Sequence, residues 1–214
     1  DIPDGSIDMI LADLPYGGVT ACKWDVLIPF EPLWAHYKRV IKKRGAVVLF
    51  GTFPFTAMLW ASNPGWFKYD LVWEKTRGNG FPHAKNKPLS VHESILIFSS
   101  GAVAHESKSS NRMVYNPQMT VGKPYTKQNK GLTRYNWSQM QRPSFQSDFL
   151  QINKGERFPL SVIKFSNPNY KSNHETAKPV ALLEYLIRTY TNEGELVLDN
   201  TMGSGSTGEA CLRR

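Results

Sequence analysis

The sequence predicts an α/β fold with helices on both faces of one sheet. Short apolar runs of strand length alternate with longer segments in which apolar residues recur at helical spacing. Turns that contain glycine and proline separate these segments. Strands that alternate with helices favour crossover connections within a single sheet. A chain of 214 residues is also long enough for one sizeable core and a smaller lobe.

The first part of the chain, residues 1–98, supplies most of the predicted strands. A buried apolar run predicts the first strand at residues 6–12. Apolar residues at helical spacing predict a helix over residues 31–43, which Gly45 would end. The other predicted elements of this part are a strand at 46–50, a helix at 55–62, strands at 69–74 and 94–98, and the polar loop between those two strands at 77–88.

Hydrophobic periodicity weakens in the middle of the chain and then returns. Residues 99–158 are rich in Asn, Gln, Ser and Lys and are expected to form an insertion. Residues 159–214 contain predicted strands at 160–165 and 195–198, on either side of a helix that begins at Pro179. The apolar stripe of that helix, which should pack on the sheet, consists of Val180, Leu183, Leu186, Ile187 and Tyr190.

The positive charge of the chain is concentrated in the insertion. The formal net charge is +8, and the stretch from Gly101 to Leu160 holds nine Lys or Arg residues against three acidic ones. These cations lie among aromatic residues, a combination that favours a polyanionic partner such as nucleic acid. The candidate DNA contacts are Lys123, Lys127, Lys130, Arg134 and Arg142.

Several classes of protein do not fit the composition. The sequence has no run of 18 apolar residues, so no membrane span is predicted. The two cysteines, Cys22 and Cys211, are far apart and lack neighbours that could bind a metal, so neither a disulfide framework nor a metal site is expected.

Residues that could bind a base follow the first predicted strand, where open α/β sheets bind ligands. Asp13, Leu14, Pro15 and Tyr16 offer a carboxylate, an exposed backbone carbonyl and an aromatic ring within four residues. Such a set suits a flat base with an amino group, because the two oxygens accept its N–H hydrogens while the ring stacks. A capped turn that ends the strand is the alternative interpretation.

A second stretch with ligand-binding character, residues 198–208, follows the last predicted strand. Its glycines let the backbone approach a nucleoside closely at the start of a helix. It lacks the Gly-Lys-Ser/Thr ending of a phosphate-binding loop, which argues against an NTPase. Gly203, Gly205 and Gly208 have dinucleotide spacing, so an NAD-type oxidoreductase stays open on this motif alone, although no acidic residue follows at the usual distance.

Together these stretches resemble the DNA methyltransferases that modify amino groups. Residues 13–16, Asp-Leu-Pro-Tyr, are similar to the Asp-Pro-Pro-Tyr catalytic motif of that family. Residues 199–205, Asp-Asn-Thr-Met-Gly-Ser-Gly, resemble its cofactor motif Asp-Pro-Phe-x-Gly-Ser-Gly. Residues 174–179, His-Glu-Thr-Ala-Lys-Pro, resemble its His-x-x-x-Lys-Pro signature. The catalytic motif precedes the cofactor motif, which is the permuted order of the beta class.

The resemblance implies a Rossmann-like S-adenosylmethionine-dependent methyltransferase sheet with circularly permuted motifs. Residues 1–98 would form the catalytic half, residues 99–158 an inserted target-recognition region, and residues 159–214 a cofactor-binding half that is truncated at its C-terminus. The implied catalytic residues are Asp13, Leu14, Pro15 and Tyr16. The implied cofactor-binding residues are Asp199, Thr201, Met202, Gly203, Ser204, Gly205, Lys178, Phe50 and Gly51.

The substrate implied by the resemblance is double-stranded DNA with a flipped target base. Asp13 favours adenine N6, because the cytosine-N4 group more often begins its motif with serine; cytosine-N4 methylation and an inactive DNA-binding fragment remain alternatives. The loop from Gly78 to Pro88 would lie near the DNA, with His92 and Glu93 as structural support. A cognate restriction endonuclease is a candidate partner, and the expected location is cytoplasmic, for a bacterial or phage-encoded protein. The family pattern continues past both ends of the chain, so a longer enzyme is expected.

Overall fold

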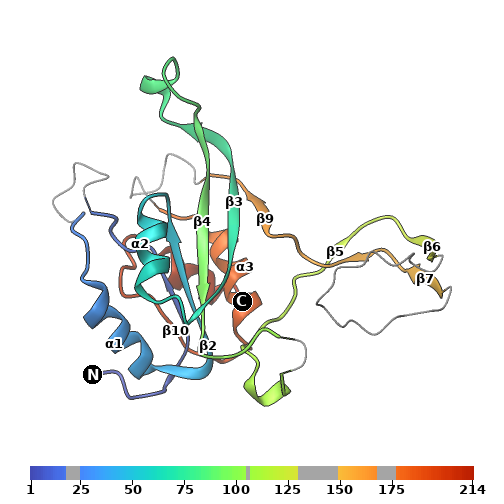
Figure 1. Ribbon diagram of the computed structural model, residues 1–214, viewed down its shortest axis with the longest axis horizontal. Helices are drawn as coiled ribbons and strands as arrows, with labels where there is room; N and C mark the ends of the chain where they lie inside the picture. Colours follow the sequence, from blue (N-terminus) through green and yellow to red (C-terminus); the bar gives the residue numbers. More distant parts are fainter. Residues whose placement is uncertain (18–24, 105–106, 130–148, 168–176) are drawn as a thin grey trace, which may run out of the picture. The chain divides into compact units, whose positions relative to one another are not determined.

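The computed structural model divides the described part of the chain into two compact units (Figure 1). The first comprises residues 1–116 and 160–214, and the second residues 117–159. The expected insertion began at residue 99, but residues 99–116 pack with the first unit because Met113 lies in its core, against Gly101. The structure describes residues 1–17, 25–104, 107–129, 149–167 and 177–214.

Six strands form the sheet of the first unit. Their order is β10 (Val197–Leu198), β1 (Ile7–Ala12), β2 (Ile41–Gly51), β4 (Ser90–Phe98), β3 (Phe67–Asn79) and β9 (Val162–Phe165). Neighbouring pairs are parallel except that β4 runs antiparallel to both β2 and β3. A single reversed strand therefore lies among five that share one direction.

Two helices cover each face of this sheet. On one face, α1 (Phe30–Val40) and α2 (Phe55–Ser62) pack on the side chains of Ile10, Val47 and Leu96. On the other, α3 (Val180–Tyr190) and α4 (Ser206–Leu212) pack on the alternate side chains of the same strands. The stripe predicted for α3 is buried here apart from the half-buried Val180. The α/β class with both faces covered is thus confirmed.

The end of the first helix differs from the prediction. α1 stops at Val40, and Ile41 begins β2 by pairing with Ile7 of β1. Ile41 is buried next to Val40 and Tyr37, so its spacing fits a helix as well as a strand. The predicted helix over residues 31–43 is therefore three residues too long at its C-terminus. The Ile41 side chain is buried equally well in a strand that pairs with β1, so its spacing alone could not locate the end of the helix.

The hairpin of β3 and β4 is longer than its apolar residues indicate. β3 extends to Asn79, three residues into the polar loop predicted at 77–88, and β4 begins at Ser90, four residues before the predicted strand, so the short 3₁₀ turn η1 (Phe81–His83) lies near the tip. Figure 1 shows this hairpin continuing beyond the other strands of the sheet. A second 3₁₀ turn, η2 (Ser109–Asn111), lies in the segment that follows β4.

The second unit contains two short antiparallel ladders. β5 (Thr120–Val121) pairs with β8 (Glu156–Arg157), and β6 (Tyr125–Asn129) pairs with β7 (Phe149–Asn153). The guanidinium of Arg157 lies 5.0 Å from the centre of the Tyr125 ring and donates to the Lys123 carbonyl at 2.5 Å. Arg157 thus connects one ladder to the start of the other.

The described residues contain neither a membrane-spanning helix nor a metal-binding cluster. None of the helices there has the length and apolar character needed to cross a bilayer. The same residues contain no group of three or more His, Cys, Asp or Glu side chains arranged to hold a metal ion.

Candidate active site

A cleft of about 1570 Å³ opens at one edge of the sheet in the first unit. The five strands that share a direction present their carboxyl ends at this edge, which is where open α/β sheets bind their ligands. Because β4 is reversed, it brings its amino end to the same edge. The residues that line the cleft at or near these strand ends include Asp13, Thr52, Lys75, Glu93, Asn167 and Asp199.

The two motifs predicted to share one cleft do so. β1 and β10 are parallel neighbours, with Met9 opposite Val197. The turn after β1 and the loop after β10 therefore leave the sheet side by side. Asp13, Leu14, Pro15 and Tyr16 all line the cleft, although the Leu14 side chain is buried in the core beneath it. The prediction that the two motifs meet at adjacent strand ends is confirmed.

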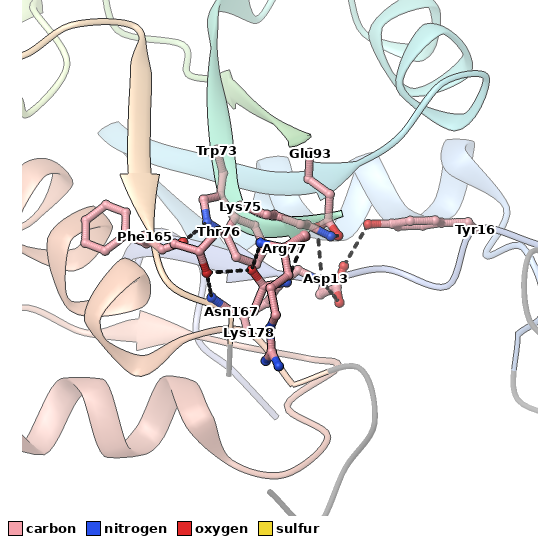
Figure 2. A network of polar contacts seen from close by, with 10 residues as sticks. All are labelled: Asp13, Tyr16, Trp73, Lys75, Thr76, Arg77, Glu93, Phe165, Asn167 and Lys178. Atoms are coloured by element: carbon pink, nitrogen blue, oxygen red, sulfur yellow. Dashed lines mark hydrogen bonds and ion pairs between the residues drawn. The ribbon is translucent and has the colours of Figure 1, made fainter. Parts of the chain in front are cut away.

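Asp13 is held by two donors in this structure (Figure 2). The Tyr16 hydroxyl donates to Oδ1 at 3.1 Å, and the Lys178 ammonium donates to Oδ2. The Asp13 side chain is 28% exposed, against 10% for Lys178. The carboxylate is therefore accessible from the cleft while its cationic partner is largely buried.

The Tyr16 side chain is fixed at both ends. Its ring stacks on Phe55 of α2, with ring centres 4.7 Å apart and planes inclined by 23°. Burial raises the pKa of the Tyr16 phenol well above its ordinary value, and the nearby Asp13 charge raises it further. The hydroxyl consequently stays protonated and remains a hydrogen-bond donor.

Lys178 lies between two carboxylates and an aromatic ring. Its Nζ is 3.5 Å from Oε2 of Glu93 and 5.2 Å from the centre of the Phe50 ring. Burial alone would lower the pKa of Lys178, but the charges of Asp13 and Glu93 outweigh that effect, so the pKa is raised. Lys178 is therefore a charged group inside the cleft.

The glycine-rich loop after β10 is braced by its own acid. Asp199 accepts the Thr201 backbone N–H at 2.9 Å and the Thr207 hydroxyl at 2.6 Å. The Tyr37 hydroxyl of α1 donates to Asn200 at 2.7 Å. Asp199 thus ties the loop to the first turn of α4, so its role in this structure is to shape the loop.

The other predicted site residues fall into three groups. Phe50, Lys178, Asp199, Thr201, Met202, Gly203 and Ser204 line the cleft, whereas Gly51 and Gly205 are not among its lining residues. Lys123 and Lys127 are exposed in the second unit. Lys130, Arg134, Arg142, Cys22 and the first three residues of the His-x-x-x-Lys-Pro signature, His174 to Thr176, lie outside the described residues.

One ion pair of the cleft joins two residues that were not predicted as site residues. Lys75 of β3 and Glu93 of β4 form an ion pair, and their side chains are 8% and 13% exposed. Glu93 was expected only to support the neighbouring loop, and His92 beside it is exposed. The sequence contains one signal for this pair: Lys75 directly follows one predicted strand and Glu93 directly precedes another. Charged residues next to buried strands are seldom buried without a partner. Which charges pair depends on strand register, which the sequence does not display.

Comparison with known families shows what the chain is similar to. The family model described as DNA methylase matches residues 7–214. The DNA adenine methyltransferase YhdJ of Escherichia coli is 27% identical over 223 residues, covering 99% of this chain and 70% of the relative. The type II methyltransferase M.HpaI of Haemophilus parainfluenzae is 25% identical over 225 residues, covering 99% of this chain and 62% of the relative.

Solved structures share the fold at lower identity. The cytosine-N4-specific PvuII DNA methyltransferase superposes with a TM-score of 0.62 at 16% identity, over 99% of this chain and 73% of that one. The complex of M1.HpyAVI with SAM gives a TM-score of 0.56 at 21% identity, over 97% of this chain and 78% of that one.

Proposed function

The chain belongs to the DNA methylase family, and from that membership we propose that it transfers the methyl group of S-adenosylmethionine to adenine N6 in double-stranded DNA. One observation carries the proposal: the Asp13 turn and the Asp199 loop follow adjacent parallel strands and open into one cleft. A methyl donor held by the loop can therefore reach an amino group held by the turn.

The cleft fits S-adenosylmethionine in size and chemistry. Its volume of about 1570 Å³ exceeds the roughly 300–1,000 Å³ of ordinary small-ligand sites, which leaves room for a base beside the cofactor. Gly203 and Gly205 have φ of 49° and 80°, so the loop turns in a conformation that side chains disfavour. Thr201 and Ser204 offer hydroxyls to the nucleoside and amino-acid groups. When bound, the cofactor would supply an electrophilic methyl group.

The residues after β1 would prepare the amino group for attack. An exocyclic amine is a weak nucleophile because its lone pair is delocalised into the ring. Asp13 and the Leu14 carbonyl would accept its two hydrogens and so localise that pair on nitrogen, while Tyr16 packs against the base. Positioning of this kind contributes most of the rate without a covalent enzyme intermediate.

The tip of the β3–β4 hairpin would contact the DNA that delivers the base. From Arg77 to Leu89 the chain carries four basic residues, counting His83, and no acidic one. Phe81 is 75% exposed there and lines the cleft. Phosphate contacts from Lys85 and Lys87 would offset the unstacking of the flipped base, which costs a few kcal/mol. The cations of the second unit, Lys123 and Lys127 among them, are the proposed target-recognition contacts.

Asp13→Ala is expected to abolish methyl transfer by the full-length protein while leaving its affinity for DNA nearly unchanged. The variant removes the acceptor for the amino hydrogen but none of the proposed phosphate contacts. Transfer of labelled methyl groups to DNA and a separate binding titration check the two halves of this prediction. Turnover at the wild-type rate would contradict the assignment of Asp13.

The choice of adenine over cytosine rests on Asp13 and on the resemblance to an adenine methyltransferase, while a cytosine-N4 enzyme shares the fold. Enzymatic digestion of the methylated DNA to nucleosides, followed by mass spectrometry, distinguishes the two. N6-methyl-2′-deoxyadenosine is the expected product, and N4-methyl-2′-deoxycytidine would reject adenine while keeping the same pocket. A cognate restriction endonuclease, for which the type II relative is the support, and a cytoplasmic location are further parts of the proposal.

A further inference from the structure

Four residues of alternating charge form a chain of ion pairs within the cleft (Figure 2). Lys75 pairs with Oε1 of Glu93, Lys178 lies near Oε2 of Glu93, and Lys178 also pairs with Asp13. The side chains of Lys75, Glu93 and Lys178 are at most 13% exposed. Asp13 is the most exposed member, so the end of the chain that a substrate can reach is Asp13.

Lys178 lies beside two carboxylates but donates a hydrogen bond to only one of them. It donates a hydrogen bond to Asp13. Oε2 of Glu93 is buried and makes no hydrogen bond with any residue that the structure describes, although Lys178 Nζ lies 3.5 Å away. Buried polar atoms in this condition are uncommon and call for an explanation. Glu93 therefore has acceptor capacity left beside the ammonium of Lys178.

The Asp13 carboxylate already has two donors in this state. Both of its oxygens accept hydrogen bonds, one from Tyr16 and one from Lys178. In the proposed reaction the same carboxylate must accept an N–H of the target base. A charge-assisted hydrogen bond to a buried ammonium competes with that contact, since such bonds are stronger than neutral ones.

We propose that Glu93 is a positioning residue for methyl transfer, which takes over the ammonium of Lys178 when Asp13 engages the amino group of the base. This inference rests on the proposed function, because it requires Asp13 to be the group that meets the base. The movement is small: Nζ needs to approach Oε2 by about 0.7 Å to reach the usual length of a charge-assisted hydrogen bond.

The exchange also balances charge during the reaction. The amino nitrogen forms a bond to the methyl carbon, and the electron pair of the broken carbon–sulfur bond stays on sulfur. The methylated nitrogen then gives one proton to Asp13, which becomes neutral. The buried ammonium of Lys178 would then lose its charged partner Asp13, and an ammonium without a close carboxylate is costly in a protein interior. Glu93 supplies that counter-charge.

The test is Glu93→Gln in the full-length protein, assayed with S-adenosylmethionine and duplex DNA. Glutamine keeps the size of the side chain and removes its charge, so Lys178 remains on Asp13. We expect kcat to fall by roughly ten- to a hundredfold, the cost of a misplaced reacting group. The KM for cofactor and the Kd for DNA should change by less than about twofold, because ground-state binding does not use Glu93.

Glu74→Gln is the matched control. Glu74 lies on the same hairpin, pairs with Lys164 at 2.7 Å, is 42% exposed and does not line the cleft. The control should keep wild-type kcat. Thermal unfolding of each variant shows whether it folds. If Glu93→Gln does not fold, the neutral pair Lys75→Met/Glu93→Gln removes both charges of the buried ion pair and is assayed with the same expectation.

Two further variants separate positioning from a structural role. Glu93→Asp keeps the charge and is expected to recover part of the kcat that Glu93→Gln loses. In a Lys178→Met background, Glu93→Gln should cause little additional loss, because the residue through which Glu93 acts is gone.

Wild-type kcat in Glu93→Gln, or a loss that adds in full to that of Lys178→Met, would overturn the positioning role. Asp13→Ala separates this failure from failure of the proposed function. If Asp13→Ala retains turnover, Asp13 does not meet the base and both ideas fall. If Asp13→Ala is inactive and Glu93→Gln is unaffected, only the role of Glu93 falls.

Discussion

At the scale of single residues, Tyr16 connects helix α2 with the Asp13 carboxylate. The ring packs on Phe55, and the hydroxyl donates to Asp13. These two contacts belong to different parts of one side chain, so a phenylalanine at this position keeps the first and loses the second. The residue therefore offers a way to measure the hydroxyl contact alone.

Tyr16→Phe is expected to lower kcat by several-fold, about the worth of one hydrogen bond to a charged group, and Tyr16→Ala to lower it further. Because burial raises the pKa of the Tyr16 phenol, the hydroxyl stays protonated between about pH 6 and pH 10. The pH dependence of kcat should therefore have the same shape in Tyr16→Phe and wild type. A limb of the wild-type profile that disappears in Tyr16→Phe would contradict this assignment.

The sequence identifies Asp13 but not its environment. A carboxylate directly after an apolar strand marks a ligand site by position alone, and β1 ends as expected. That Lys178 reaches Asp13 across 165 positions in the chain depends on the packing of α3 against the sheet, which periodicity does not encode. Glu93 is still harder to assign, since its partner Lys75 lies on the other strand of a hairpin.

At the scale of elements, the extended β3–β4 hairpin places its basic tip at the mouth of the cleft. Lys85→Ala/Lys87→Ala is expected to weaken DNA binding and to reduce the slope of log K against log salt by about two, one for each lost phosphate contact. Titration of duplex DNA at several salt concentrations measures that slope. Lys43→Ala is the control, because Lys43 is exposed and lies near the amino end of β2, away from the ligand edge of the sheet. Equal slopes for the double variant and wild type would remove the hairpin from the interface.

The positions of strands and helices could be predicted wherever the spacing of apolar residues fitted only one of these two structures. Helix α2 has the predicted bounds, and β1 differs by one residue. Errors arise where one side chain suits two structures, as Ile41 does, or where pairing extends a strand into polar sequence, as in β3 and β4. In both cases a neighbouring strand, which local sequence cannot represent, decides the outcome.

At the scale of the molecule, cofactor binding and folding should be coupled. A ligand that binds only the folded state at a hundred times its Kd stabilises it by about 2.7 kcal/mol. S-adenosylhomocysteine is therefore expected to raise the Tm of the full-length protein by roughly 5–10 °C. Scanning fluorimetry checks this, and absence of any shift would favour a DNA-binding protein without a cofactor.

Thr207→Val offers an internal comparison for that experiment. The substitution removes the hydroxyl that ties Asp199 to α4 but leaves the side chain nearly unchanged in size. The glycine-rich loop should lose its brace, so the Tm of the free protein should fall slightly and the ligand-induced shift should shrink. A full shift in this variant would show that the loop does not need the brace to bind the cofactor.

The reversal of β4 has a consequence for how such a protein can diversify. Because β3 ends and β4 begins on the ligand side of the sheet, residues 80–88 can be lengthened or exchanged without altering any strand crossing. A transplanted loop would change which DNA gains entry, yet leave the chemistry beneath it intact. This segment is therefore a natural place to alter DNA contacts without changing Asp13, Glu93 or Lys178.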